Sequence, residues 1–364
     1  MKKIGIDARL YFQTGVGVYV RNLLHYLQDT RLGNEYLFYI YLLDEDFDKI
    51  VFSNKNFVKR RANFRWHSIS EQIGFLSLIK NDNLDLMHFT YFSYPIFYNR
   101  KFIITVHDLT PYFLKTGVSS TKGFIMYQIK HFFYRLVIRQ QIEKSSVIVT
   151  PTEAVKRQII SKFGAKYNDK IVFIHEGVNY EILDNKDKNV IKKDTPKGFF
   201  IYVGNFYPHK NVESLVKAFS LSKTKADLLL IGPQDYFSGR LRRQITSLGL
   251  DDRIKFIFRA NQTELIYFYK NALALIHPSL SEGFGLPIIE AAYFNLPVIA
   301  SDISVFRELM GKDYTSFDPT DIADIRDKID GFVKRQKKGI NDIAARFSFA
   351  EMSRRTMGLY KQYA

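Results

Sequence analysis

The chain of 364 residues contains no cysteine. It can therefore form no disulfide bond, no thiolate zinc site and no cysteine nucleophile. It also lacks any run of about 18 uncharged apolar residues, the length that a membrane-spanning helix needs. The amino terminus, MKKIGIDARL, lacks the apolar stretch of a signal peptide, because Asp7 and Arg9 interrupt it. We therefore expect a cytoplasmic protein, with a peripheral position at the inner face of the membrane left open.

Acidic residues are scarce relative to basic ones. The chain has 37 Asp and Glu against 53 Lys and Arg, which gives a net charge of +16, and residues 1–180 carry +10 of it. Such a balance suits an anionic partner: a nucleic acid, an anionic membrane surface or a phosphorylated substrate. No RNA- or DNA-binding module is recognisable, so we do not expect a nucleic acid.

Short apolar runs alternate with segments of helical periodicity along the chain. This alternation is typical of βαβ units and parallel sheets. The runs that predict strands are KIGID, YLFYIYLL, LDLMHF, FIITVH, VIVT and IVFI, then FFIYVG, ADLLLIG, RIKFIF, ALALIH and LPVIAS.

These two series predict an α/β fold with two Rossmann-like, doubly wound domains. We expect an N-terminal domain at residues 1–180 and a polar, lysine-rich linker at 181–198. A second domain should cover 199–346, and a C-terminal helix at 347–364 should return to the first domain. Ligands of open α/β sheets bind beyond the carboxyl ends of strands, so the two domains should face each other across a substrate cleft.

The segment HPSLSEGFGLPIIEA follows a predicted strand and opens a helix. Its glycines allow a phosphate to approach the backbone, and its second proline suits a first helical turn. The amides of Phe284, Gly285 and Leu286 would then lie at a helix N-terminus, where an anion can bind. Glu282 and Glu290 would repel a phosphate and are better suited to accept hydrogen bonds from sugar hydroxyls. The structural alternative is a glycine-rich turn with a glutamate favoured by the helix dipole.

Glu282 and Glu290, with seven residues between them in the frame PSLSEGFGLPIIEA, resemble the signature of the group 1 (family 4) retaining glycosyltransferases with GT-B architecture. Members of this type assemble bacterial surface polysaccharides. The resemblance implies a GT-B-like fold, a nucleotide-sugar donor in the second domain, an acceptor in the first, and retention of the anomeric configuration. It extends over nearly the whole chain through the segments IGIDARLYFQTGVGVYVRNLL, IITVHDLTP, FIYVGNFYPHKNVESLVKAF, LPVIASDISVFRELMG and SFDPTD.

Lys210 follows the run FFIYVG and precedes a helix that Asn211 can cap. A lysine beside a helix N-terminus suits a diphosphate, and the matching lysine of the resembling family binds the donor diphosphate. The arginine that is common in the family is missing, because Asn205 occupies its position. Arg259, after the run RIKFIF, is a candidate substitute. No Asp-x-Asp pair stands out beside this site, so we expect no metal and no required cofactor.

His107 ends the run FIITV and could hydrogen-bond a sugar hydroxyl or shuttle a proton. The resemblance places it beside the donor sugar, with its backbone carbonyl facing the anomeric carbon. Gly15 and Gly17 precede the first helical pattern. We expect Gly17 to allow a close approach of the diphosphate or acceptor to the backbone, accompanied by Arg9.

Residues 121–144 predict a basic helix with a broad apolar face. It could bind an anionic membrane surface, or it could pack on the sheet with its basic face solvated. The apolar face is assigned to Phe124, Ile125, Ile129, Phe132, Phe133, Leu136 and Val137.

The sequence thus predicts transfer of a hexosyl unit from a GDP-, UDP- or dTDP-linked donor to a hydroxyl of a glycan or lipid-linked acceptor. The run YPHKN resembles mannosyltransferases. Two alternatives remain open: a sugar-nucleotide epimerase of the same shape, and a non-catalytic protein that binds anionic surfaces. The expected catalytic residues are Glu282, which holds the sugar, His107 and Lys210. The expected donor-binding residues are Gly17, Lys210, Phe284, Gly285, Leu286 and the ribose-binding Glu290.

Overall fold

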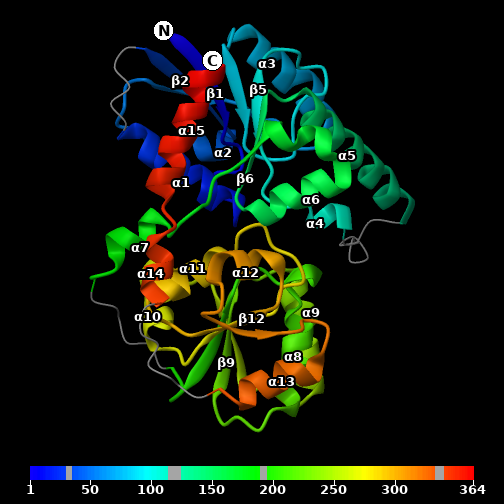
Figure 1. Ribbon diagram of the computed structural model, residues 1–364, viewed down its shortest axis with the longest axis vertical. Coiled ribbons are helices and arrows are strands. Elements are labelled where there is room, and N and C mark those ends of the chain that lie inside the picture. The colour runs from blue at the N-terminus through cyan, green and yellow to red at the C-terminus, as the bar shows by residue number, and fades with distance from the viewer. Residues whose placement is uncertain (30–34, 114–123, 189–194, 333–339) are drawn as a thin grey trace. The chain divides into compact units, whose positions relative to one another are not determined.

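Two parallel β-sheets organise the part of the chain that the computed structural model describes, namely residues 1–29, 35–113, 124–188, 195–332 and 340–364. Figure 1 shows its helices and strands. The chain divides into two compact units, each with one sheet. The first unit comprises residues 1–176 and 349–364, and the second comprises residues 177–348. Across the described ranges, every helix is too short or too polar to cross a membrane.

The first unit has a seven-stranded sheet in the order β3-β2-β1-β4-β5-β6-β7, and all its described pairings are parallel. Its strands are β1 (Lys2–Asp7), β2 (Tyr36–Leu42), β3 (Phe57–Arg61), β4 (Leu86–Phe89), β5 (Phe102–Thr105), β6 (Val147–Thr150) and β7 (Ile171–Phe173). Its α-helices are α1 (Val16–Gln28), α2 (Asp44–Phe47), α3 (Leu76–Asn81), α4 (Thr110–Phe113), α5 (Phe124–Lys144), α6 (Glu153–Phe163) and α15 (Phe349–Tyr363).

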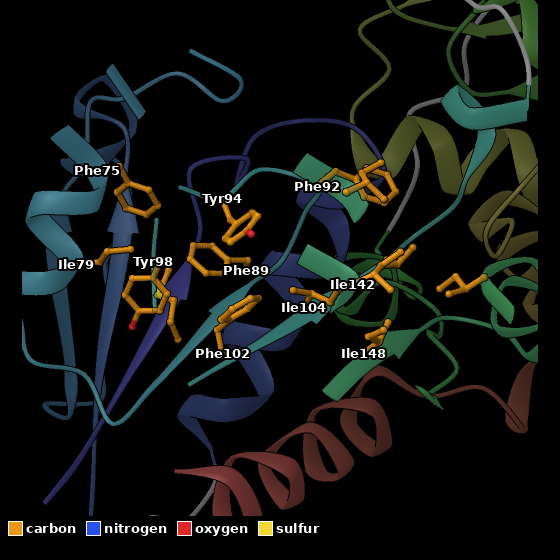
Figure 2. Packing of buried hydrophobic residues seen from close by; sticks show 14 of the residues in the cluster. Phe75, Ile79, Phe89, Phe92, Tyr94, Tyr98, Phe102, Ile104, Ile142 and Ile148 are labelled. Atoms are coloured by element: carbon orange, nitrogen blue, oxygen red, sulfur yellow. The ribbon is translucent and has the colours of Figure 1, made fainter. Parts of the chain in front are cut away.

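The core of the first unit is rich in aromatic rings. Figure 2 shows Phe89, Tyr94, Tyr98 and Phe102 gathered on the sheet. The rings of Tyr94 and Phe102 stack with centroids 5.3 Å apart, and Phe89 meets Phe102 edge-on at 5.5 Å. Offset and edge-on pairs of this kind add to the stabilisation that burial alone provides. The core therefore fixes the strands whose carboxyl ends carry the polar residues of this unit.

The second unit has a six-stranded parallel sheet in the order β10-β9-β8-β11-β12-β13. Its strands are β8 (Phe199–Val203), β9 (Asp227–Gly232), β10 (Ile254–Phe258), β11 (Leu275–His277), β12 (Val298–Ser301) and β13 (Thr315–Phe317). Its helices are α7 (Tyr180–Asn185), the 3-10 turn η4 (Pro208–Lys210), α8 (Val212–Leu221), α9 (Tyr236–Ser247), α10 (Gln262–Asn271), α11 (Leu286–Tyr293), α12 (Ser304–Met310), α13 (Ile322–Asp330) and α14 (Ile340–Ala345).

Each sheet has one point where the winding direction reverses. In the second unit the chain runs from β8 outward to β9 and β10, then crosses to β11 on the other side of β8. The first unit reverses in the same way between β1 and β4. Ligands of open α/β sheets bind at such switch points, outside the carboxyl ends of the strands. The loops after β8 and β11 are therefore the place to examine first.

The eleven runs that predict strands all form strands, and two further strands, β3 and β13, come in addition. The expected linker is corrected in its first part. Asn179 caps α7 by accepting a hydrogen bond from the Glu181 amide, and α7 packs on α10 within the second unit. Helix α15 belongs to the first unit, where it packs along α1.

The helix predicted at residues 121–144 is α5, and one residue assigned to its apolar face, Phe133, is exposed. Residues 121–123, and the side chains of residues 124–132, lie outside the description. Phe133, assigned to the apolar face, is 58% exposed, whereas Ile138 and Ile142 are buried in the core cluster. Leu136 and Val137 are half-buried. The assignment of Phe133 to the packed face is therefore wrong.

Candidate functional site

The loops after β8 and β11 lie together because these two strands are neighbours in the sheet. Leu275 of β11 pairs with Ile201 of β8. The two loops are also joined directly, since the Leu280 amide donates a hydrogen bond of 2.8 Å to the His209 carbonyl. The sequence therefore brings residues about 70 positions apart onto one edge of the second unit, as expected from the carboxyl ends of parallel strands.

An ion pair joins Lys210 and Glu282 at this edge. The Lys210 Nζ atom lies 2.7 Å from Glu282 Oε1 and 2.8 Å from Oε2. The side chains are 17% and 8% exposed. The sequence assigns Lys210 to a diphosphate and Glu282 to a sugar, and the structure shows in addition that the two charges offset each other. A diphosphate at Lys210 would therefore share the ammonium with Glu282.

Two further side chains hold Glu282, and neither was assigned a role from the sequence. Ser279 Oγ donates to Glu282 Oε1 at 2.7 Å, and His277 Nε2 lies 2.9 Å from the same oxygen. A carboxylate only accepts, so Nε2 carries the hydrogen. Burial by itself raises the pKa of the Glu282 carboxyl. The Lys210 charge and the His277 hydrogen bond outweigh it, and they hold the pKa well below its usual range.

The His277 ring is fixed by two aromatic neighbours. It stacks on Tyr202 with ring centroids 5.7 Å apart and meets Phe306 edge-on at 5.6 Å. Only 1% of His277 is exposed, and its Nδ1 atom has no hydrogen-bond partner within the described part of the chain. The ring therefore has one orientation, which points Nε2 at Glu282. The sequence signal was present, because both His277 and Ser279 lie within the motif that contains Glu282.

Glu290 lies one turn into α11 and is 7% exposed. Tyr269 Oη donates a hydrogen bond of 2.7 Å to its Oε2 atom. Burial raises the pKa of Glu290 to about 7. The Tyr269 hydrogen bond opposes this rise and the charge of Glu181 adds to it. Glu290 is therefore a carboxyl group that titrates near neutrality.

The start of α11 has the geometry that its sequence predicts. Gly285 is the N-cap with φ +96°, a conformation that favours glycine, and a Cβ there would approach Phe306 to 2.9 Å. Leu286 begins the helix and Pro287 occupies its first turn. The first amides of an α-helix have no intrahelical acceptor. Phe284 is buried and its ring meets Phe347 edge-on at 5.7 Å, which anchors the loop.

Two predictions around Lys210 need correction or restriction. Asn211 does precede α8, but it makes no side-chain cap. Its backbone is left-handed, with φ +58°, and its amide group donates to the Pro319 carbonyl. Asn205 lies in the turn after β8, and the Tyr207 amide donates to it. Arg259 is exposed after β10, which β9 separates from β8, so its proposed substitution for the missing arginine stays a prediction.

In the first unit, His107 is held by neighbours after β4 and β7. Its Nε2 atom lies 3.0 Å from the Thr90 carbonyl, and its Nδ1 atom lies 3.3 Å from Glu176 Oε1. The ring meets Tyr19 edge-on at 4.8 Å. A carbonyl only accepts, so Nε2 carries a hydrogen. These contacts fix the ring, and with it the backbone at the carboxyl end of β5.

Gly17 and Arg9 have internal roles in the first unit. A Cβ at Gly17 would lie 2.6 Å from the Tyr11 carbonyl oxygen, so glycine is needed for packing of α1 on the loop after β1. Arg9 is 2% exposed and forms ion pairs with Asp7 at 2.6 Å and Glu71 at 2.7 Å. The expectation that Arg9 accompanies a ligand is therefore wrong, because two buried carboxylates occupy its guanidinium.

Histidine, aspartate and glutamate do not gather in threes in a metal-binding arrangement anywhere in the ranges that the structure describes. The positively charged and hydrogen-bonding groups at the second unit's switch point are Lys210, His277, Ser279, Tyr269 and the first amides of α11. Lys210, His277 and Ser279 contact the Glu282 carboxylate, whose pKa is held low, and Tyr269 contacts Glu290, whose pKa burial raises to about 7. Such a set can bind an anion beside hydroxyl groups.

Two family models match consecutive stretches of the chain. The model described as glycosyltransferase family 4 matches residues 13–182, and the model described as glycosyl transferases group 1 matches residues 184–345. The second stretch contains the whole cluster around Lys210 and Glu282. Together the matches support glycosyl transfer over the epimerase alternative.

Proteins with similar sequences include O-antigen chain mannosyltransferases. The O-antigen chain mannosyltransferase RfbU of Salmonella typhimurium is 28% identical over 271 residues, which are 74% of this chain and 71% of that protein. O-antigen chain mannosyltransferase B of Escherichia coli is 28% identical over 130 residues, 35% of this chain and 34% of that protein.

Solved structures agree in fold over the full length. Sucrose-phosphate synthase from Thermosynechococcus elongatus has a TM-score of 0.77 at 17% identity and covers 100% of this chain and 99% of its own. Anabaena Alr3699/HepE, solved with UDP-glucose, has a TM-score of 0.72 at 16% identity, with 100% of both chains covered. The expected GT-B-like fold of two Rossmann-like domains is confirmed.

Proposed function

Because the chain belongs to the group 1 (family 4) glycosyltransferases, we propose that it transfers a mannosyl unit from a nucleotide-sugar. The proposed acceptor is a glycan or a lipid-linked saccharide, and the anomeric configuration is retained. The observation that carries the proposal is the joint position of Lys210, Glu282 and Glu290 at the switch point of the second unit. The Lys210 cation and the two buried carboxyl groups of Glu282 and Glu290 match the parts of a nucleotide-sugar: diphosphate, sugar and ribose.

The chemistry requires stabilisation of a departing diphosphate. Lys210 and the first amides of α11 would supply positive potential where the negative charge develops. In the unliganded chain Glu282 offsets Lys210, and this carboxylate also disfavours a free diphosphate that brings no sugar. With the whole donor bound, the ammonium moves toward the leaving group while Glu282 accepts hydrogen bonds from the sugar hydroxyls. Lysine and backbone amides would do the work that a divalent ion does elsewhere, so we propose that turnover needs no metal.

Retention of configuration follows the family resemblance. No described carboxylate is assigned as a nucleophile in this chain, and we propose attack on the same face through an oxocarbenium-like state. His107 is proposed to lie at the donor sugar, where its backbone carbonyl stabilises the reacting carbon. The contacts of its ring with Thr90 and Glu176 support a fixed backbone at this position.

The choice of mannose rests on the similarity to two O-antigen chain mannosyltransferases. We propose a GDP-linked donor and a saccharide on a lipid carrier as the acceptor, at the cytoplasmic face of a membrane. The basic excess of residues 1–180 supports an anionic surface as the place of work.

The test is turnover with a panel of donors. The purified protein would be incubated with GDP-mannose, UDP-glucose, UDP-galactose or dTDP-rhamnose, a lipid-linked saccharide fraction and EDTA, and the product linkage would be determined by NMR. We expect transfer from GDP-mannose with an α-linked product in the presence of EDTA. An inverted linkage would refute retention, and activity that appears only with a divalent ion would refute metal independence. Conversion of a donor to an isomer without an acceptor would instead indicate an epimerase.

A further inference from the structure

Tyr269 and Glu290 form a nearly buried pair between α10 and α11. Tyr269 is 1% exposed and Glu290 is 7% exposed. The tyrosine hydroxyl donates to Glu290 Oε2 at 2.7 Å. A hydrogen bond to a carboxylate is stronger than one between neutral groups, so it fixes the orientation of the acid.

The position of the tyrosine hydroxyl is itself fixed. The Tyr269 ring stacks on Phe294, just after α11, with centroids 5.8 Å apart and planes 15° apart. The ring therefore cannot swing away from Glu290 without breaking this stack. Tyr269 binds Oε2, and no hydrogen bond from the described residues to the other oxygen, Oε1, accompanies it.

Among the residues that the structure describes, no cation acts on the Glu290 carboxyl. Glu181 of α7 is the charged neighbour that acts on it, and Gln262 donates to Glu181 at 2.7 Å. Lys270 of α10 donates instead to the Lys186 carbonyl. The remaining groups on the elements packed against α11 are His277 of β11, which faces Glu282, and Asp342 of α14, which is exposed.

We infer that Tyr269 is a positioning residue that sets the preference of the donor site for ribonucleotides, by orienting Glu290 so that Oε1 accepts the ribose hydroxyls. The inference rests on the proposed function, which places the donor ribose at Glu290. Tyr269 also favours the ionised form of the acid, because an O–H donor stabilises a carboxylate. Burial raises the pKa of Glu290 to about 7 against this effect, so the preference for ribose should fall as the pH drops through neutrality.

The experiment compares binding of GDP and 2′,3′-dideoxy-GDP by isothermal titration from pH 5.5 to 8.5. Wild-type protein should bind GDP about tenfold more tightly at pH 8 and lose this preference below pH 7, since a hydrogen bond to an ionised group is lost. Tyr269→Phe should lower the preference and move its midpoint to higher pH, while the affinity for dideoxy-GDP stays unchanged. Tyr267→Phe is the matched control. Tyr267 lies on the same helix, α10, but its hydroxyl contacts Thr195, so its loss should change neither the preference for GDP nor the midpoint pH.

The outcomes separate the two claims. Equal binding of GDP and dideoxy-GDP by the wild-type protein would refute the ribose role of Glu290, and with it that part of the proposed function. A wild-type preference that Tyr269→Phe leaves unchanged, in size and in midpoint, would overturn only the role of Tyr269. If Tyr269→Phe does not fold, 3-fluorotyrosine at position 269 serves instead. Its stronger donor should move the midpoint to lower pH, and an unmoved midpoint would overturn the inference.

Discussion

The ion pair of Lys210 and Glu282 changes what single substitutions at this site should do. The two residues are bonded to each other before any donor arrives, at 2.7 and 2.8 Å. Lys210 is therefore not a free cation that waits for phosphate. Its proposed affinity for a diphosphate would be the difference between that interaction and its ion pair with Glu282.

Glu282→Gln should therefore tighten binding of a free nucleoside diphosphate and slow turnover. The substitution removes a negative charge from the Lys210 ammonium and weakens the hold on the sugar hydroxyls. We expect a gain in diphosphate affinity of up to about tenfold, in line with the strength of a charge-assisted hydrogen bond. Titration calorimetry with GDP and a turnover assay measure the two effects. Glu213→Gln on α8, an exposed position, is the control, and weaker GDP binding by Glu282→Gln would contradict this account.

Glu290→Gln should stabilise the protein in a way that depends on pH. The folded-state pKa of about 7 lies above the ordinary value of 4.5, so the unfolded chain loses the proton first as the pH rises. Stability is therefore lost between about pH 4.5 and 7 and stays low above 7, by up to about 3 kcal/mol. Glutamine does not titrate, so the variant keeps its stability as the pH rises. Its side-chain carbonyl can still accept the hydrogen bond from Tyr269.

Urea denaturation at pH 5 and pH 8 measures the difference. Glu290→Gln should be more stable than the wild type by up to about 1 kcal/mol at pH 5 and by about 3 kcal/mol at pH 8. Glu213→Gln should match the wild type at both values. A variant that is less stable than the wild type at pH 8 would show that the buried carboxyl is not destabilising when ionised.

At the residue scale, the sequence identified the charged groups of the motif, gave no role to His277 and Ser279 within it, and missed the residues that only the fold brings together. Lys210, Glu282 and Glu290 were predicted because each follows a strand or opens a helix. Tyr269 and Glu181 were not, since they reach Glu290 from α10 and α7, and no local pattern encodes that contact.

At the element scale, the missed pieces are the ones with weak hydrophobic signals. Strand β3 (Phe57–Arg61) ends in three basic residues and lies at an edge of its sheet, where charged side chains are tolerated. Strand β13 has only three residues and also lies at an edge. Central strands are buried on both faces and were predicted without exception, because they are continuous apolar runs.

The packing of helix α1 on the loop after β1 can be tested at Gly17. Gly17→Ala should destabilise the protein by about 1–3 kcal/mol, because the new Cβ would overlap the carbonyl oxygens of Leu10 and Tyr11. Gly358→Ala on α15 is the matched control. Apart from the backbone of its own helix and its chain neighbours, no atom of the described residues lies within 4 Å of a Cβ there. Alanine also favours a helix, so stability should stay equal or rise. Thermal denaturation measures both, and equal effects of the two substitutions would contradict the packing role of Gly17.

At the scale of the whole molecule, the first unit is built from two separate stretches of chain. Residues 349–364 return to it after the second unit is complete. Tyr360 of α15 then meets His88 of β4 through a hydrogen bond of 2.6 Å, in a fully buried position. The sequence predicted that the last helix returns to the first domain, as it does, but it did not reveal the contact of Tyr360 with His88.

The charge of the molecule predicts binding to anionic vesicles. Exposed apolar side chains of the first unit, Ile69, Phe97 and Phe133, accompany its basic excess. Flotation with anionic vesicles should carry the protein at low salt and release it at high salt, because exposed charges are screened. The variant Arg135→Glu/Arg139→Glu on α5 should float less, whereas Lys217→Glu/Lys255→Glu in the second unit should not change. Absence from vesicles at both salt concentrations would remove the idea.

The most direct test of the donor site is titration of GDP into three proteins: the wild type, Lys210→Ala and Lys217→Ala. Lys217 is exposed on α8, the helix that follows the loop with Lys210. It controls for the loss of any lysine in this region. We expect Lys210→Ala to bind GDP roughly 10- to 100-fold more weakly, since a charge-assisted hydrogen bond is lost and Glu282 is left to repel the diphosphate. Lys217→Ala should bind as the wild type does. A folded Lys210→Ala protein with wild-type affinity for GDP would show that the donor diphosphate does not bind at the switch point of the second unit.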